Sequence, residues 1–249
     1  MSKPDEKGQP EKGTICVSGA AGGIGETLVR RLLEEGYAVS AWDLAPGPLA
    51  NLANSRFVFR ALDTRDIKAL DAAVADAQAR FGKLHGFVSL AAIYKAQPFL
   101  DIDEETWDAH FSINLKGTML AAQAALPPLR AQKSGSVVLF SSLMARTGLA
   151  GSAAYAATKG GILGLARAMA LDVAADNVRV NTVSPTIADT AMPRANLSDE
   201  QMQVRADASP MKRLGMPLDM AEAAIFLLDP DNSYMTGADI RVNGGSTLF

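Results

Sequence analysis

The sequence has few of the residues that mark several classes of protein. Its one cysteine, Cys16, excludes an internal disulfide and fits a reducing compartment, where we expect a buried, inert thiol. The two histidines, His85 and His110, have no companions at metal-ligand spacing, so no metal site is predicted. No apolar run approaches the roughly 20 residues that span a membrane. The formal net charge of -3 lacks the positive excess that is typical of proteins with nucleic-acid partners.

What remains is a soluble protein that we expect in the cytoplasm. Its 249 residues suit one large α/β domain with a substantial buried core. The first segment, 1–13, consists largely of Lys, Glu, Gly and Pro without an apolar stretch, so it resembles neither a signal peptide nor an anchor. We predict a flexible tail over 1–13 and a single domain over 14–249.

A glycine-rich turn near the start of the chain predicts a dinucleotide site. The short apolar run 15–17 opens into Gly19, Gly23 and Gly25, and a helical pattern of leucines follows. Strand, glycine turn and helix in this order let the backbone approach a pyrophosphate at the start of the helix. Ile24 is expected to cover the turn from inside. By itself, such a turn could equally be a plain strand-to-helix connector.

The next predicted strand, 37–43, ends in an acid, Asp43. An acid at this strand end can accept both ribose hydroxyls of NAD, and it repels the additional phosphate of NADP. Neither the following Leu44 nor the glycine turn supplies a basic residue for that phosphate. The residues therefore favour NAD. The alternative is that Asp43 is a solvated strand end.

A tyrosine and a lysine four residues apart form the third motif. Tyr155 and Lys159 lie in a segment, 152–171, that is predicted to be a helix, so they share one face. The pKa of a free phenol is near 10, and work near neutrality requires a shift of roughly 2–3 units, part of which an ammonium can supply. Ser142, after the apolar run 137–140, could hold a substrate oxygen that shares a proton with the phenol. Alone, such a Tyr–Lys pair is common on exposed helices.

Together, the spacing of the glycines and the residues Ser142, Tyr155 and Lys159 resemble the short-chain dehydrogenase/reductase family, over about Thr14 to Gly245. The resemblance implies one Rossmann-like domain, a doubly wound parallel sheet in three α/β/α layers, and alternating strands and helices agree with it. It also implies a homotetramer and a mobile lid over the substrate at about 191–213. Arg146, in the loop 143–151 beside the site, could meet an anionic substrate, although a solvated arginine is the simpler interpretation.

The resemblance also implies roles for individual residues. Tyr155 is expected to exchange the proton of the alcohol, Lys159 to lower the phenol pKa and bind the nicotinamide ribose, and Ser142 to polarise the substrate oxygen. Asn114, in a predicted helix over 106–126, is expected to kink that helix and complete a proton path through water. Further cofactor contacts are implied at Asp63, Ala91, Pro185, Ala188 and Thr190. For Asp63, a cap on the helix that starts after Asp66 remains the alternative.

The sequence departs from the family pattern in three places. The predicted strand 86–92 ends in Ser89-Leu90-Ala91-Ala92 where Asn-Asn-Ala-Gly is usual, which removes the usual side-chain bracing of the sheet. Thr186 replaces a glycine after Pro185. The segment between Asp43 and Asp63 is too short for the usual crossover helix.

These observations predict an NAD-dependent oxidoreductase that interconverts a secondary alcohol and a ketone by hydride transfer, with NAD suggesting the oxidative direction. Two alternatives stay open. One is an NADPH-dependent carbonyl reductase of the oxoacyl type, against which Asp43 argues. The other is a non-catalytic dinucleotide-binding sensor, against which the presence of Tyr155 and Lys159 argues. The identity of the small-molecule substrate is not encoded in any motif.

Overall fold

Short buried runs alternate with helices along the chain and assemble into a parallel sheet. The computed structural model describes residues 12–247, so most of the predicted tail 1–13 lies outside the described residues. Seven strands lie in the order β3-β2-β1-β4-β5-β6-β7, and each neighbouring pair is parallel. Every residue of β1 and β6 is buried, as expected for strands covered on both faces. The strands are β1 (Thr14–Ser18), β2 (Ala38–Asp43), β3 (Phe57–Ala61), β4 (Leu84–Ser89), β5 (Gly135–Phe140), β6 (Val178–Pro185) and β7 (Asp239–Val242).

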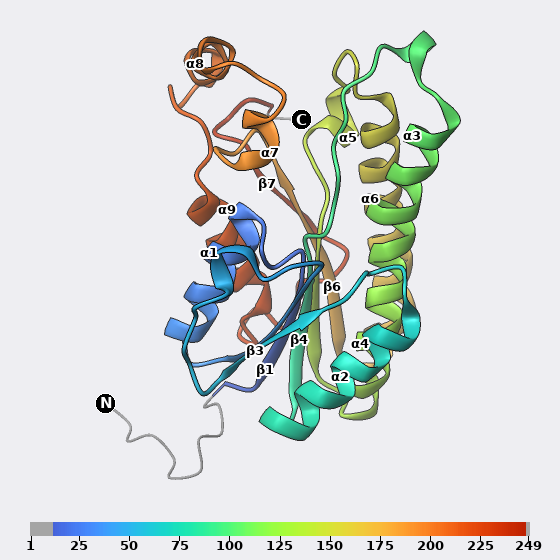
Figure 1. Ribbon diagram of the computed structural model, residues 1–249. Coiled ribbons are helices and arrows are strands. Elements are labelled where there is room, and N and C mark those ends of the chain that lie inside the picture. Colours follow the sequence, from blue (N-terminus) through green and yellow to red (C-terminus); the bar gives the residue numbers. More distant parts are fainter. Residues whose placement is uncertain (1–11, 248–249) are drawn as a thin grey trace.

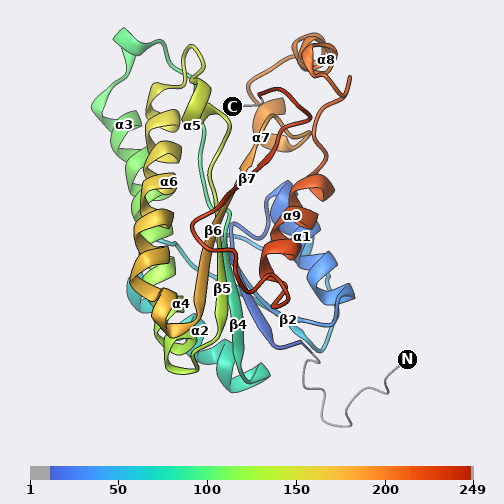
Figure 2. The ribbon, with the colours of Figure 1, turned by 180° about the vertical axis from the view of Figure 1, so that it is seen from behind.

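Helices cover both faces of this sheet, which confirms the predicted Rossmann-like, three-layer fold (Figure 1). Helices α2, α4 and α6 lie on one face, and α1 and α9 pack against each other on the other face (Figure 2). These five helices are α1 (Gly23–Glu34), α2 (Ile67–Phe81), α4 (Thr118–Ala131), α6 (Ala153–Val173) and α9 (Pro217–Leu228). Four shorter helices are α3 (Glu104–His110), α5 (Met144–Thr147), α7 (Ala191–Arg194) and α8 (Asp199–Ala208). In the described part of the chain, no helix has both the length and the hydropathy for a membrane span.

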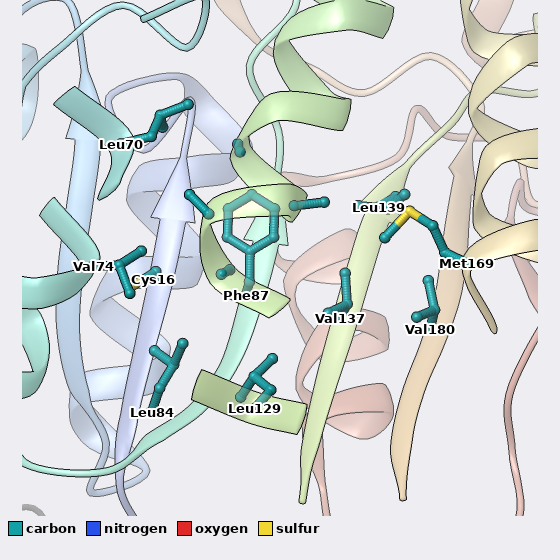
Figure 3. Packing of buried hydrophobic residues seen from close by; sticks show 14 of the residues in the cluster. Cys16, Leu70, Val74, Leu84, Phe87, Leu129, Val137, Leu139, Met169 and Val180 are labelled. Atoms are coloured by element: carbon teal, nitrogen blue, oxygen red, sulfur yellow. The ribbon is translucent and has the colours of Figure 1, made fainter. Parts of the chain in front are cut away.

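Alternate residues of the strands fill two separate cores. Cys16 of β1 and Phe87 of β4 point toward α2 and α4, where Leu70, Val74 and Leu129 enclose them (Figure 3). Burial raises the pKa of the Cys16 thiol, so the thiolate is disfavoured and the thiol is inert, as predicted. The strand residues that point to the other face of the sheet pack against α1 and α9; they include Ile15, Val17, Val88, Val138 and Val183.

The strand order places the site. It reverses between β1 and β4, and in sheets of this kind a crevice opens at the carboxyl ends of the strands where the order reverses. The glycine turn follows β1 and therefore lies at this point. Helices α5, α7 and α8 lie at the same end of the sheet (Figure 1).

Two predicted elements end elsewhere than expected. Strand β4 ends at Ser89 and not at Ala92. The Leu90 amide still bonds to the Ser18 carbonyl at 2.9 Å, but beyond it the chain runs against the Gly19 turn, so no partner strand continues. Between β2 and β3 only a 3-10 turn forms, η1 (Gly47–Leu49), which confirms that a crossover helix is missing there.

The helix predicted over 106–126 is longer and is not uniform. It begins as α3, passes through a π-helical segment, η3 (Phe111–Gly117), and continues as α4 to Ala131. Asn114, where a kink was expected, lies in this π-helical segment. Helix α4 continues through Pro127 and Pro128, which have no N–H to donate to the carbonyls of Gln123 and Ala124.

We predict that Phe87→Ala destabilises the protein by about 3–5 kcal/mol, since the ring is fully buried and stacks on Trp42 at a centroid distance of 5.7 Å. Urea unfolding followed by circular dichroism measures the change. Phe99→Ser, at a ring that is 74% exposed, is the matched control and is expected to stay within about 0.5 kcal/mol of wild type. Equal losses in both variants would contradict this account of the core.

Candidate active site

The glycine turn after β1 has no space for side chains. Gly19 has a φ of 71°, and a Cβ atom there would lie 2.4 Å from the Ala91 nitrogen. A Cβ atom at Gly25 would lie 2.2 Å from the Gly19 carbonyl oxygen. Helix α1 then begins at Gly23 without a side-chain cap, so its first N–H groups can bind an anion. Contacts within the chain therefore require glycine at these two positions, and the approach of a pyrophosphate to the turn stays a prediction.

Asp43 lies against this turn and is not a solvated strand end. One oxygen of its carboxylate accepts a hydrogen bond from the Ala21 amide at 2.9 Å, and the other accepts one from the Leu44 amide at 2.8 Å. These bonds hold the carboxylate at the end of β2, next to the loop that would carry the pyrophosphate. This is where an acid that selects the ribose hydroxyls has to lie.

Asp63 is held by its neighbour Arg65. The guanidinium donates to the carboxylate at 2.9 Å, and this bond lowers the pKa of Asp63. The alternative prediction, that Asp63 caps the following helix, is wrong, because the cap of α2 is Asp66, which accepts bonds from the Lys68 and Ala69 amides. The predicted contact of Asp63 with adenine stays a prediction.

The segment after β6 reaches back over the glycine turn. The methyl group of Thr190 lies 2.9 Å from the position of a Cβ atom at Gly23. Ala188 pairs with Gly215 in an isolated bridge, and the Pro185 carbonyl accepts a bond from the Leu143 amide at 2.8 Å. Thr186 has no positive φ, and its amide bonds to the Val242 carbonyl at 3.1 Å, so the missing glycine is not required for this turn. Thr190 is thus brought to the start of α1.

Ser142, Tyr155 and Lys159 meet beside the carboxyl end of β5. The Ser142 side chain lies within reach of the Tyr155 phenol and favours its charged form. The Lys159 ammonium lies 5.6 Å from the centroid of the Tyr155 ring and donates to the Phe140 carbonyl at 2.8 Å. Lys159 is only 3% exposed. The structure therefore brings together the three residues that the sequence predicted to act as a unit.

The pKa values in this cluster run opposite to the expected direction. Burial raises the pKa of Tyr155 to about 12, the Ser142 hydrogen bond opposes this, and Tyr94 adds to it. Burial also lowers the pKa of Lys159 to about 8. The expected lowering of the phenol pKa by Lys159 is not seen in the net shift, because burial is its largest cause and Lys159 is not among the causes.

Asn114 links the loop after β4 to helix α6. Its side-chain oxygen accepts a bond from the Ile93 amide at 2.8 Å, and its amide group donates to the Ile93 carbonyl at 3.0 Å and to the Thr158 hydroxyl at 3.3 Å. Thr158 precedes Lys159 on α6. Asn114 is fully buried, so these bonds satisfy its amide and fix the loop beside Lys159. The proton path through water stays a prediction.

A chain of buried hydroxyls replaces the side-chain bracing that the sequence lacks. The Ser89 hydroxyl lies 3.4 Å from that of Ser18 on β1 and 3.1 Å from that of Thr118 on α4. Thr118 in turn donates to the Asn114 carbonyl at 2.7 Å. The bracing of the central strands is therefore retained by smaller side chains. The only signal in the sequence was a serine in an otherwise apolar run.

Two residues beside the site were not predicted. The ring of Tyr94 packs edge-on against that of Tyr155, with centroids 5.1 Å apart and an interplanar angle of 77°, and its hydroxyl shares a hydrogen bond with the Ser152 hydroxyl at 2.9 Å. His110 is buried; its Nδ1 donates to the Thr106 carbonyl at 2.7 Å, and its Nε2 accepts from the Lys95 amide at 3.2 Å. Both residues hold the loop after β4. For Tyr94, a position just past a strand end was the available signal.

We predict that burial of Lys159 makes stability depend on pH. The folded pKa of about 8 lies below the ordinary value of 10.5, so between these values the unfolded chain binds more protons and the free energy of unfolding rises with pH. Lys159→Met lacks this contribution. The difference in unfolding free energy between wild type and variant should rise by on the order of 1–2 kcal/mol from pH 7.5 to pH 9.5, below the range in which Tyr155 contributes.

Urea unfolding at four pH values within this window measures the difference. A difference that stays constant or falls would show that the ammonium is not desolvated as the structure places it.

Comparisons with known proteins agree with this geometry. A family model described as "Enoyl-(Acyl carrier protein) reductase" matches residues 19–247. The chain is 36% identical to 2-(S)-hydroxypropyl-CoM dehydrogenase 3 of Xanthobacter autotrophicus, over 94% of this chain and 96% of the relative. A Brucella melitensis structure described as a short-chain dehydrogenase/reductase, glucose/ribitol dehydrogenase, is 34% identical, with a TM-score of 0.90 over 97% of this chain and 99% of that one.

A third match concerns the fold alone. The structure of ElxO with NADP bound is 24% identical, with a TM-score of 0.86 over 94% of this chain and 98% of that one. The family model and the first two relatives, together with the fold, show that the protein belongs to the short-chain dehydrogenase/reductase family.

Proposed function

We propose that the protein is an NAD-dependent oxidoreductase that interconverts a secondary alcohol and a ketone. The observation that carries the proposal is the cluster of Ser142, Tyr155 and Lys159, which lies at the same edge of the sheet as the uncapped start of α1. A phenol, a hydroxyl and an ammonium at this edge can manage the proton of an alcohol, whereas a plain binding module has no need of them.

The residues fit a nicotinamide dinucleotide. The Gly19–Gly25 turn and the first N–H groups of α1 would hold the pyrophosphate, Asp43 the adenosine ribose, and Thr190 and Ala188 the far end of the cofactor. When bound, the nicotinamide supplies the hydride donor or acceptor at C4. We further propose that Ala91, Pro185, Ile24 and Asp63 complete the cofactor site.

The side chains of this chain then manage the proton. In oxidation, the substrate loses a hydride from its carbinol carbon and the hydroxyl proton to the Tyr155 oxygen, and reduction is the reverse. Ser142 holds the substrate oxygen next to the phenol, and Lys159 meets the ribose from α6. Asn114 fixes the loop opposite them. Because the pKa of Tyr155 is raised to about 12, the phenol is protonated near neutrality, which suits donation to a ketone.

The outer face of α6 supports a homotetramer. The absence of a side chain at Gly161 is explained within the chain, where a Cβ atom would lie 2.9 Å from Leu115. At Gly164, on the exposed side of the same helix, a Cβ atom would meet nothing within 4 Å. Glycine costs helix stability, so an exposed one is accounted for by a helix of a second copy that packs closely there.

We predict that Tyr155→Phe lowers kcat for alcohol oxidation by roughly 10²–10⁴-fold, because the proton acceptor is lost. NADH formation across cyclic, aromatic and sugar alcohols, each with NAD and NADP, measures it. In the wild type the rate should increase with pH between 7 and 10, since the phenolate fraction grows as the pH approaches the raised pKa of Tyr155.

Tyr234→Phe, at a fully exposed ring, is the matched control and is expected to keep full activity. Turnover that survives in Tyr155→Phe would refute the assignment of the base. Tight binding of NADH by the wild type without turnover of any alcohol or ketone would favour the sensor.

We predict that Asp43→Asn shifts the ratio of kcat/KM for NAD over NADP toward NADP by roughly tenfold or more, since the repelling charge is removed while one acceptor for the Ala21 amide remains. Initial rates with both cofactors measure the ratio, and fluorescence titration with NADH and NADPH measures binding without turnover. Asp71→Asn, an exposed acid on α2, is the control. A wild type that uses NADP alone would instead support the carbonyl reductase.

A further inference from the structure

The side of the site that faces Tyr155 is formed by an aromatic ring with a fixed position. Tyr94 contacts the ring of Tyr155 edge-on at 5.1 Å, which is a favourable geometry for two aromatic rings. Its own hydroxyl is not free to act on a substrate, since it shares a hydrogen bond with Ser152, the residue before α6 begins. Tyr94 therefore places a half-buried aromatic ring against the ring that carries the reacting hydroxyl.

The loop that carries Tyr94 is bound on both sides of it. Asn114 holds Ile93 by both backbone groups, and His110 accepts a bond from the Lys95 amide. Farther along, the Gln97 amide donates to the Gly151 carbonyl at 2.8 Å, which joins this loop to the segment 143–151. A ring held by so many bonds has lost its conformational freedom before a ligand arrives, and a ligand that packs on it need not order it.

Most basic side chains on the segments around the site are already bound within the chain. Arg146 donates to Asp239 at 2.9 Å, and that carboxylate is nearly buried and also accepts bonds from the Thr182 and Ser184 hydroxyls. If Arg146 turned to a substrate anion, it would leave Asp239 without its counter-charge, which is costly for a buried group. Arg146 is exposed, as the simpler interpretation held, but its guanidinium is engaged by Asp239 and is not free for an anion.

Two arginines of the predicted lid, 191–213, are likewise bound to acids of this chain. Arg194 is paired with Asp189 and Asp199, and Arg213 is paired with Asp219 at 3.0 Å. Such exposed pairs are individually weak, but each sets a carboxylate beside the guanidinium, and that carboxylate repels an anionic substrate.

Three cations on these segments have no ion pair among the described residues: Lys95, Lys212 and Arg205. Lys95 donates to the Thr106 hydroxyl and Lys212 to the Asp207 carbonyl, at 2.9 and 2.8 Å. Arg205 on α8 has no such bond, so it is the first of the three to test for binding of an anion.

We propose that the substrate is an uncharged alcohol or ketone with a flat apolar group on the carbinol carbon, and that this group packs on the ring of Tyr94. The proposal rests on the proposed function, and it names the class of substrate for the same site. Tyr94 acts as a specificity residue: it contacts the substituent of the substrate, while Tyr155 exchanges the proton.

The test compares matched alcohols in the wild type and in Tyr94→Ala and Tyr94→Phe. The alcohols are 1-phenylethanol, the same molecule with a 4-carboxylate, and propan-2-ol. We expect 1-phenylethanol to exceed its carboxylate by at least tenfold in kcat/KM. We expect Tyr94→Ala to raise KM for 1-phenylethanol by about tenfold and to change propan-2-ol by less than about threefold, since an aromatic contact is lost only with the first. Tyr94→Phe, which keeps the ring, should remain within about threefold of wild type for both.

Two outcomes would overturn the proposal. An equal loss of kcat for both neutral alcohols in Tyr94→Ala would show that Tyr94 only positions Tyr155. A preference for the carboxylate that disappears in Arg205→Gln would show that the site takes an anion. Titration of acetophenone into the complex with NADH, followed by NADH fluorescence, tests the contact without turnover. If acetophenone binding weakens in Tyr94→Ala but no alcohol or ketone turns over, the proposed function is refuted and the contact with Tyr94 is not. If the wild type does not bind acetophenone, the proposed substrate class is refuted.

Discussion

The contact between the turn after β1 and the loop after β4 is the constraint on which the site depends. The backbone of Gly19 lies so close to Ala91 that any side chain at Gly19 would overlap it. The loops after β1 and β4, the two strands between which the order reverses, are therefore in direct contact. This contact sets the height at which β4 ends and directs the following loop across the site. Asn114, His110 and Ser152 then hold that loop, and Tyr94 takes its place beside Tyr155 as a result.

Buried hydroxyl groups near this contact hold the central strands where other members of the family use asparagine side chains. The Ser89 hydroxyl contacts those of Ser18 and Thr118, and Thr118 extends this chain of bonds to the carbonyl of Asn114. Each of these groups is buried, so each needs a partner, and the chain of bonds gives one to all of them. The π-helical segment that contains Asn114 is thereby tied to the central strands.

Sequence reasoning located the site well where a motif has a local cause. A glycine turn between strand and helix, an acid at a strand end and a Tyr–Lys pair at helical spacing each follow from a few neighbouring residues, and the structure brings Gly19, Asp43, Ser142, Tyr155 and Lys159 to one edge of the sheet. Tyr94 and His110 were missed because their roles come from partners far along the chain. The end of β4 was misplaced for the same reason, since Gly19, some 70 residues earlier, stops it.

The direction of the pKa shifts could not be predicted from a local sequence pattern either. A spacing of four residues predicts that an ammonium and a phenol are neighbours, but it is silent on how much water each has lost. Here burial lowers the pKa of the Lys159 ammonium, which is bonded to a carbonyl, and Tyr94 adds to the effect of burial in raising the pKa of the phenol. Both effects favour the uncharged forms of the pair. A protonated phenol in such a site agrees with the proposed substrate class, because the burial that raises the pKa of Tyr155 would also disfavour a charged substrate.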